Sequence, residues 1–120
     1  MVVDARFKKG LELFNEGEYF ECHDTLEDLW QGTRGVDRHF LQGLIQVSVG
    51  LYHMLNGNFK GAASQLRRGL EKLHPYAPAH RGIELKAFIS EVTVYQHKAE
   101  RGESFDQNSN DIPAILLHHV

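Results

Sequence analysis

The segment 36–56 restricts the possible folds more than any other part of this sequence. Read as a helix, it carries apolar side chains around more than one face, which predicts a central helix packed on several sides. Gly43 and Gly50 share one face. Because glycine lowers helix stability by about 1 kcal/mol relative to alanine, we expect a neighbouring helix to approach closely there. The apolar residues are Phe40, Leu41, Leu44, Ile45, Val47, Leu51, Met54 and Leu55.

Four further helices are predicted around this segment. Helical spacing of apolar residues covers 4–15, 18–31, 59–73 and 81–100. Asp4 is a suitable N-cap for the first helix, and Gly17 suits the left-handed position after its end. No stretch alternates as a strand does. The sequence therefore predicts an all-α protein, a compact array of about five helices with a long central third helix.

Two parts of the chain resemble each other at an offset of forty residues. In both, a helix ends at a glycine, Gly17 or Gly57, and an aromatic residue two positions later begins the next helix. This similarity predicts two helical hairpins paired as in tetratricopeptide-type proteins. We expect residues 1–102 to form a single helical domain. Residues 103–120 would be a polar linker and a short apolar C-terminal segment, which either docks on the body or serves another subunit.

The composition is that of a soluble globular protein. Of 120 residues 42% are hydrophobic, and the formal net charge of −3 argues against a broad nucleic-acid-binding surface. Cys22 is the only cysteine, which excludes an internal disulfide and fits a reducing compartment. The N-terminus does not read as a signal peptide, and no window approaches a membrane span. We expect a cytoplasmic protein with neither nucleic acid nor membrane as its partner.

The second predicted helix carries the most distinctive side chains. On a helix Tyr19, His23, Leu26, Glu27 and Trp30 fall on one face. That face is otherwise apolar, so we expect it to point inward and to bury His23 together with Glu27. Trp30 is interpreted as a packing anchor whose indole N–H needs a partner if it is buried, and Tyr19 as the start of the core stripe.

His23 and Glu27, one helical turn apart, are candidate ligands of a divalent metal. Further ligands would come from the third helix, where His39 or His53 would complete the shell. The alternative, which we favour, is that Glu27 accepts a hydrogen bond from His23 and that the pair fastens helices together, since buried polar groups must be paired. The third helix has four polar residues in line on one face: His39, Gln42, Gln46 and His53.

Charge is spread unevenly along the chain. Between Lys9 and Arg34 there is no basic residue but there are seven acidic ones: Glu12, Glu16, Glu18, Glu21, Asp24, Glu27 and Asp28. Most basic residues come later, including Lys60, Arg67, Arg68, Lys72, Arg81 and Lys86. This pattern predicts either two solvated faces or complementary patches, within the fold or between subunits.

A longer pattern surrounds the His23–Glu27 pair. Tyr19-Phe20-Glu21 precedes an HxxxExxW sequence at 23–30, and residues 37–46 read DRHFLQGLIQ. In these features the chain resembles the bacterial and archaeal domain of unknown function 309, over about residues 7–73. The resemblance implies a small all-helical domain. It also suggests that His23, Glu27 and Trp30 are functionally important and that they bind metal, although the family has no established activity.

Three functional hypotheses follow from these residues. The first is a non-catalytic helical module that binds a protein partner or self-associates, and we favour it over an enzyme. The alternative is a metal-dependent enzyme of the hydrolase type, in which His23, Glu27 and a residue of the third helix hold a metal that activates water. The third is a metal-free acid–base site, which needs a cleft beside His23.

Overall fold

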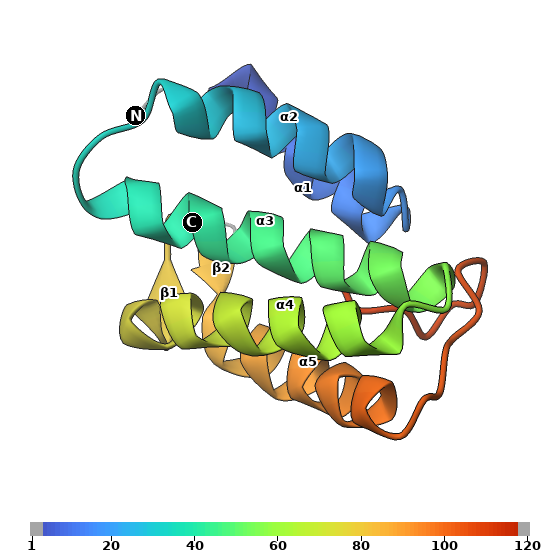
Figure 1. The fold of residues 1–120 in the computed structure, drawn as a ribbon. Coiled ribbons are helices and arrows are strands. Elements are labelled where there is room, and N and C mark those ends of the chain that lie inside the picture. Colours follow the sequence, from blue (N-terminus) through green and yellow to red (C-terminus); the bar gives the residue numbers. More distant parts are fainter. Residues whose placement is uncertain (1–3, 118–120) are drawn as a thin grey trace.

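A computed structural model describes residues 4–117 and confirms the all-α prediction (Figure 1). The long helix α3 lies in the middle, with α1 and α2 on one side and α4 and α5 on the other. Helices that follow one another in the chain account for most of the packing. The five helices are α1 (Ala5–Asn15), α2 (Tyr19–Gln31), α3 (Val36–Leu55), α4 (Phe59–Leu73) and α5 (Leu85–Glu100).

The cap before α1 and the glycine turns after α1 and α3 have the geometry that the sequence predicts. Asp4 caps α1 by accepting a hydrogen bond from the backbone N–H of Arg6 at 2.8 Å. Gly17 and Gly57 have φ of 80° and 76°, the left-handed conformation that glycine adopts without strain. In both turns the N–H groups of the glycine and of the next residue donate to carbonyls of the preceding helical turn, which reverses the chain.

The close approach predicted at the glycines of α3 is made by α4. A Cβ added to Gly43 would lie 2.9 Å from the side chain of Leu73, and one added to Gly50 would lie 2.7 Å from the side chain of Leu66. On α4 itself, Gly69 lies against the backbone of Gly43. The absence of side chains at these positions lets the two helices pack with their backbones close together.

A small β-hairpin corrects the expectation of a purely helical chain. After the short helix η1 (His74–Tyr76), β1 (Ala79–His80) pairs antiparallel with β2 (Ile83–Glu84) through a turn at Arg81 and Gly82. Both turn residues have positive φ, as tight hairpin turns require. Helix α5 therefore begins at Leu85 and not near residue 81, because strands of two residues each show no alternation that a sequence could reveal.

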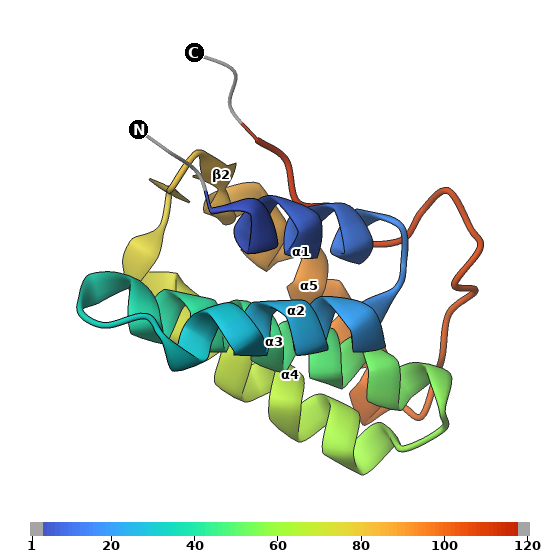
Figure 2. The same cartoon turned by 90° about the horizontal axis from the view of Figure 1, so that it is seen from above.

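The C-terminal segment docks on the body. It returns from the end of α5 to lie beside α1 and β2 (Figure 2). Asn15 exchanges two hydrogen bonds with the backbone of Ile115, at 2.7 and 3.0 Å, and Ile115 is only 3% exposed. Ile83 and Leu117 form an antiparallel bridge. Of the two alternatives for this segment, docking on its own chain is the one observed up to residue 117; residues 118–120 lie outside the described part.

Candidate functional site: an aromatic hollow beside a histidine–glutamate pair

The predicted contact between His23 and Glu27 is present, but the pair is not buried. His23 Nε2 lies 2.8 Å from Glu27 Oε2, with the two side chains 26% and 44% exposed. The buried residues of α2 are Tyr19, Cys22 and Leu26. The inward face is thus centred nearer Cys22 than His23, and the pair lies at the edge of the core. This corrects the expectation that both groups are enclosed.

Cys22, the neighbour of His23 on α2, points into the core. Its side chain has no exposed surface, and burial raises the pKa of its thiol to about 12. A thiol with so high a pKa is almost entirely protonated near neutral pH, and the thiolate is the nucleophilic form. Cys22 therefore acts as a packing residue.

A hollow of about 200 Å³ lies between α2 and α3, directly beside His23. Its walls are almost entirely apolar and come from Tyr19, Phe20, His23, Val49, Tyr52 and His53. The rings of Phe20 and Tyr52 contact each other with centroids 5.5 Å apart, and they are 50% and 38% exposed. This hollow gives His23 the adjacent cleft that an acid–base site needs, and that function stays a prediction.

The hollow brings together two of the predicted metal ligands. His53 lines it with His23, whereas His39 is exposed and is not part of its lining. Within residues 4–117, no group of three or more His, Cys, Asp or Glu side chains is arranged to hold one metal ion. Of the predicted ligands, His23 and Glu27 contact each other and His53 lines the same hollow as His23, and metal binding stays a prediction.

Four polar side-chain atoms on α2 and α3 are buried without hydrogen-bond partners. Among the described residues this holds for His23 Nδ1, Trp30 Nε1, Gln46 Oε1 and the Tyr19 hydroxyl. Trp30 packs on the core as predicted, and the guanidinium of Arg38 lies 4.0 Å from its ring centroid. Unpaired buried polar atoms cost free energy. Two of these atoms, His23 Nδ1 and Trp30 Nε1, belong to the HxxxExxW residues.

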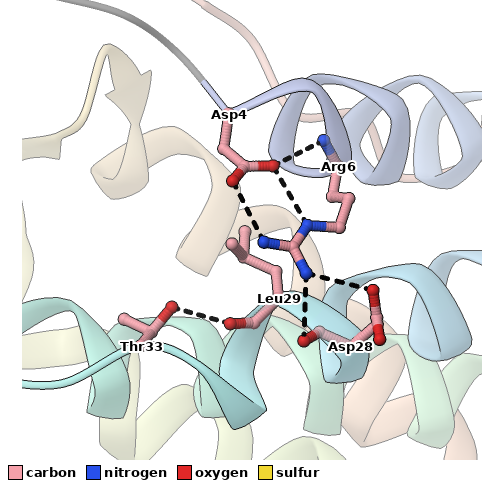
Figure 3. A network of polar contacts seen from close by, with 5 residues as sticks. All are labelled: Asp4, Arg6, Asp28, Leu29 and Thr33. Carbon is pink, nitrogen blue, oxygen red and sulfur yellow. Dashed lines mark hydrogen bonds and ion pairs between the residues drawn. The ribbon is translucent and has the colours of Figure 1, made fainter.

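The outer side of α2 is acidic. Glu18 and Glu21 line a second hollow that shares Phe20 and Tyr52 with the first. Further along α2, Asp28 is bound by Arg6 of α1 through a hydrogen bond of 3.1 Å (Figure 3). As Figure 3 shows, Arg6 lies between Asp4 and Asp28 and so joins the start of α1 to the end of α2.

A second histidine–carboxylate pair was missed by sequence reasoning. His80 of the β-hairpin lies 2.7 Å from Asp37 at the start of α3, and Arg81 donates to the same carboxylate. Partial burial alone would raise the pKa of Asp37, but the hydrogen bonds from His80 and Arg81 hold that pKa below its usual value. No local signal could have found this pair, because the hairpin that carries His80 was not predicted.

The described chain is a small all-helical domain with an aromatic hollow on one side of its central helix. Every helix in residues 4–117 is too short or too polar to span a lipid bilayer.

A family model described as "Domain of unknown function (DUF309)" matches residues 7–65, and the chain belongs to this family. The uncharacterized protein YpuF of Bacillus subtilis (strain 168) is 34% identical over 68 residues. That match covers 56% of this chain and 37% of YpuF, so the chain spans little more than a third of that relative's length. The part that the family model matches includes all residues that line the hollow.

Proposed function

We propose that this protein is a non-catalytic helical module that binds a segment of a partner protein at the hollow between α2 and α3. The observation that carries the proposal is the open aromatic surface of Phe20 and Tyr52, half and more than a third exposed on adjacent helices. Aromatic side chains in a concave surface are prominent among the residues that contribute most to protein–protein binding.

The size of the hollow favours a protein side chain over a free ligand. Its volume of about 200 Å³ is below the roughly 300–1,000 Å³ of pockets that enclose drug-sized molecules. One large apolar side chain fits such a space. The neighbouring residues of the bound segment would then lie along the open edges of α2 and α3.

Charge disfavours a second copy of this chain as the occupant. A two-fold dimer through the hollow would bring the two acidic sides of α2 together, and like charges oppose such an interface. The basic helix α4 offers no alternative anchor. In the described chain, the exposed large hydrophobic residues all lie elsewhere: Phe20, Val36, Tyr52, Val94, Leu116 and Leu117. The acidic side of α2 would likewise repel nucleic acid.

Site-specific photo-crosslinking tests the proposal. We would incorporate p-benzoylphenylalanine in place of Phe20, or of Tyr52, in cells of the natural host and irradiate them. The matched control is Val94, an apolar residue of α5 that is 53% exposed. We expect one covalent adduct with a different protein from positions 20 and 52 and none from position 94.

Three results would overturn the proposal. Adducts of equal yield from position 94 would mean that the contact is not specific to the hollow. An absence of adducts from positions 20 and 52 would mean that the hollow binds no protein in the cell. An adduct of two copies of this chain, together with a dimer in sedimentation, would replace the partner by self-association.

The metal-dependent hydrolase remains the second candidate, because His53 shares the hollow with His23 and Glu27 contacts the His23 ring. Elemental analysis of native protein separates it from the interaction module. We expect no stoichiometric zinc, manganese, iron or nickel. A stoichiometric metal that both His23→Ala and Glu27→Ala remove would favour the hydrolase, with the metal activating water.

A further inference from the structure

The carboxylates beside the hollow have no cationic partners. Among residues 4–117, no Lys, Arg or His forms an ion pair with Glu18, Glu21 or Asp24, whereas Asp28 is bound by Arg6. Glu18, Glu21 and Asp24 are also exposed. These three carboxylates are therefore available to attract a cation from outside.

Two of these carboxylates lie next to the hollow, since Glu18 and Glu21 line the second hollow that shares Phe20 and Tyr52 with it. Asp24 follows on the outer side of α2, where it lines a further hollow with Arg6. Phe20, His23 and Glu27 share the face of α2 that borders the hollow, at spacings of three and four residues. Glu21 and Asp24 lie on the adjoining outer face, three residues apart. A segment that inserts one side chain beside Phe20 would therefore run past a row of carboxylates on α2.

The walls of the hollow determine the chemistry of the inserted side chain. They are formed by Val49 and by aromatic and imidazole rings, with almost no polar atom exposed inside. A charged head group placed there would lose its hydration without gaining a hydrogen bond, which costs free energy. An apolar side chain such as leucine, methionine or phenylalanine gains free energy from the same transfer.

We propose that the segment bound at the hollow is basic, with one apolar anchor residue flanked by lysine or arginine. The inference rests on the proposed function, and it specifies the chemistry of the partner. The anchor fills the space beside Phe20 and Tyr52, and the flanking cations lie against Glu18, Glu21 and Asp24. Helix α4, which carries Lys60, Arg67, Arg68 and Lys72, lies on the other side of α3 from α2 (Figure 1), so the acidic side of α2 is where cations of the segment would be attracted.

Three synthetic peptides of equal length serve as probes, titrated into the isotope-labelled full chain and followed by NMR. The first has a central leucine flanked by lysines, the second the same leucine flanked by glutamates, and the third a central serine flanked by lysines. We expect the first peptide to bind about tenfold more tightly than the others, the effect of one important interface residue. Its largest shifts should fall at Phe20, Val49 and Tyr52, and its affinity should decrease with added salt.

Matched charge variants locate the basic flanks. Glu21→Gln combined with Asp24→Asn removes two charges beside the hollow. Glu12→Gln combined with Glu16→Gln removes two charges that are also exposed, one on α1 and one at its C-terminal cap. We expect the first double variant to weaken binding of the lysine–leucine peptide about fivefold and the second to leave it nearly unchanged. All four positions are exposed, so both variants should fold.

Equal weakening by the two double variants, or equal binding of the glutamate-flanked peptide, would overturn the inference. Failure of all three peptides would also overturn it. The crosslinking result is independent of these probes. Adducts at positions 20 and 52 without peptide binding would retain the interaction module and reject only a basic partner, whereas absence of adducts would reject the module itself.

Discussion

The two sides of α3 are built differently. Against α4 the backbones almost touch, since a Cβ added to Gly69 would lie 2.8 Å from the carbonyl oxygen of Gly43. Against α2 the helix leaves a hollow that is lined by two exposed aromatic rings, those of Phe20 and Tyr52. The comparison indicates that α4 packs more closely on the central helix than α2 does, and the α2 side carries the hollow that we propose as a binding surface.

The largest effect is expected from Gly69→Ala. The new methyl group would meet the Gly43 carbonyl at 2.8 Å and the backbone nitrogen of Val47 at 3.0 Å, and neither can move without shifting a helix. We expect the free energy of unfolding to fall by about 3 kcal/mol or more, measured by urea denaturation.

Gly32→Ala is the matched control for that substitution. Its only neighbour within 4 Å of the added Cβ is the carbonyl of Leu29 at 3.9 Å, and its φ of −95° suits any residue. We expect little change in stability. If both alanine variants unfold at the same urea concentration, α4 does not approach α3 as closely as described.

The next largest effect is expected at the start of α3, where Asp37 contacts His80 and Arg81. Asp37→Asn removes the negative charge that His80 and Arg81 share. We expect the free energy of unfolding to fall by about 2 kcal/mol near neutral pH, because hydrogen bonds to charged groups are stronger than neutral ones. The Asp37 side chain is 26% exposed, so solvent screens it only in part.

The stabilisation by Asp37 should also depend on pH. The pKa of Asp37 is lower in the folded protein than its usual value, so the folded state binds this proton less readily than the unfolded state does. The stabilisation is complete above about pH 4 and is lost as the pH falls through the folded pKa. The difference in unfolding free energy between wild type and Asp37→Asn should therefore shrink in acid. Parallel pH profiles would show that the carboxylate of Asp37 is not stabilised by its partners.

The sequence predicted those parts of this comparison that depend on local geometry. Gly17 and Gly57 indicated where α1 and α3 end, because a left-handed residue after a helix is most easily glycine. Gly43 and Gly50 indicated the close approach by a neighbouring helix, since glycine has no other favourable role inside a long helix. These signals require no knowledge of which elements meet.

The rest depended on tertiary contacts. Cys22 and His23 are adjacent and point about 100° apart on a helix. The helical pattern predicted that His23 points inward, whereas in the folded chain Cys22 is fully buried and His23 is partly exposed. The hollow arises only where Phe20 and Tyr52 meet, and each alone reads as a surface aromatic. Asp37 and His80 are 43 residues apart, joined by a hairpin too short to leave a pattern.

A smaller effect is expected on the α2 side from His23→Ala and from Glu27→Ala. Glu27 is 44% exposed, and partly exposed pairs one helical turn apart contribute little. We expect each variant to lose less than about 1 kcal/mol in thermal or urea unfolding. A loss as large as that of Asp37→Asn would mean that the pair is a structural fastening of α2 and α3 and not part of an open surface.

The smallest effect on stability, and the largest on binding, is expected from Phe20→Ser. Half of the Phe20 side chain is in solvent, and its main contacts are the rings of His23 and Tyr52 on the rim of the hollow. Substitution of such a surface residue changes the unfolding free energy by about 0.5 kcal/mol at most. Because the same ring forms a wall of the hollow, the crosslink from position 52 should disappear in this variant.

Val94→Ser is the control, an exposed apolar residue removed from α5, and it should leave the crosslink intact. If Phe20→Ser instead destabilises the fold as Gly69→Ala does, the two sides of α3 contribute alike to stability, and the aromatic rings beside the hollow are there for packing.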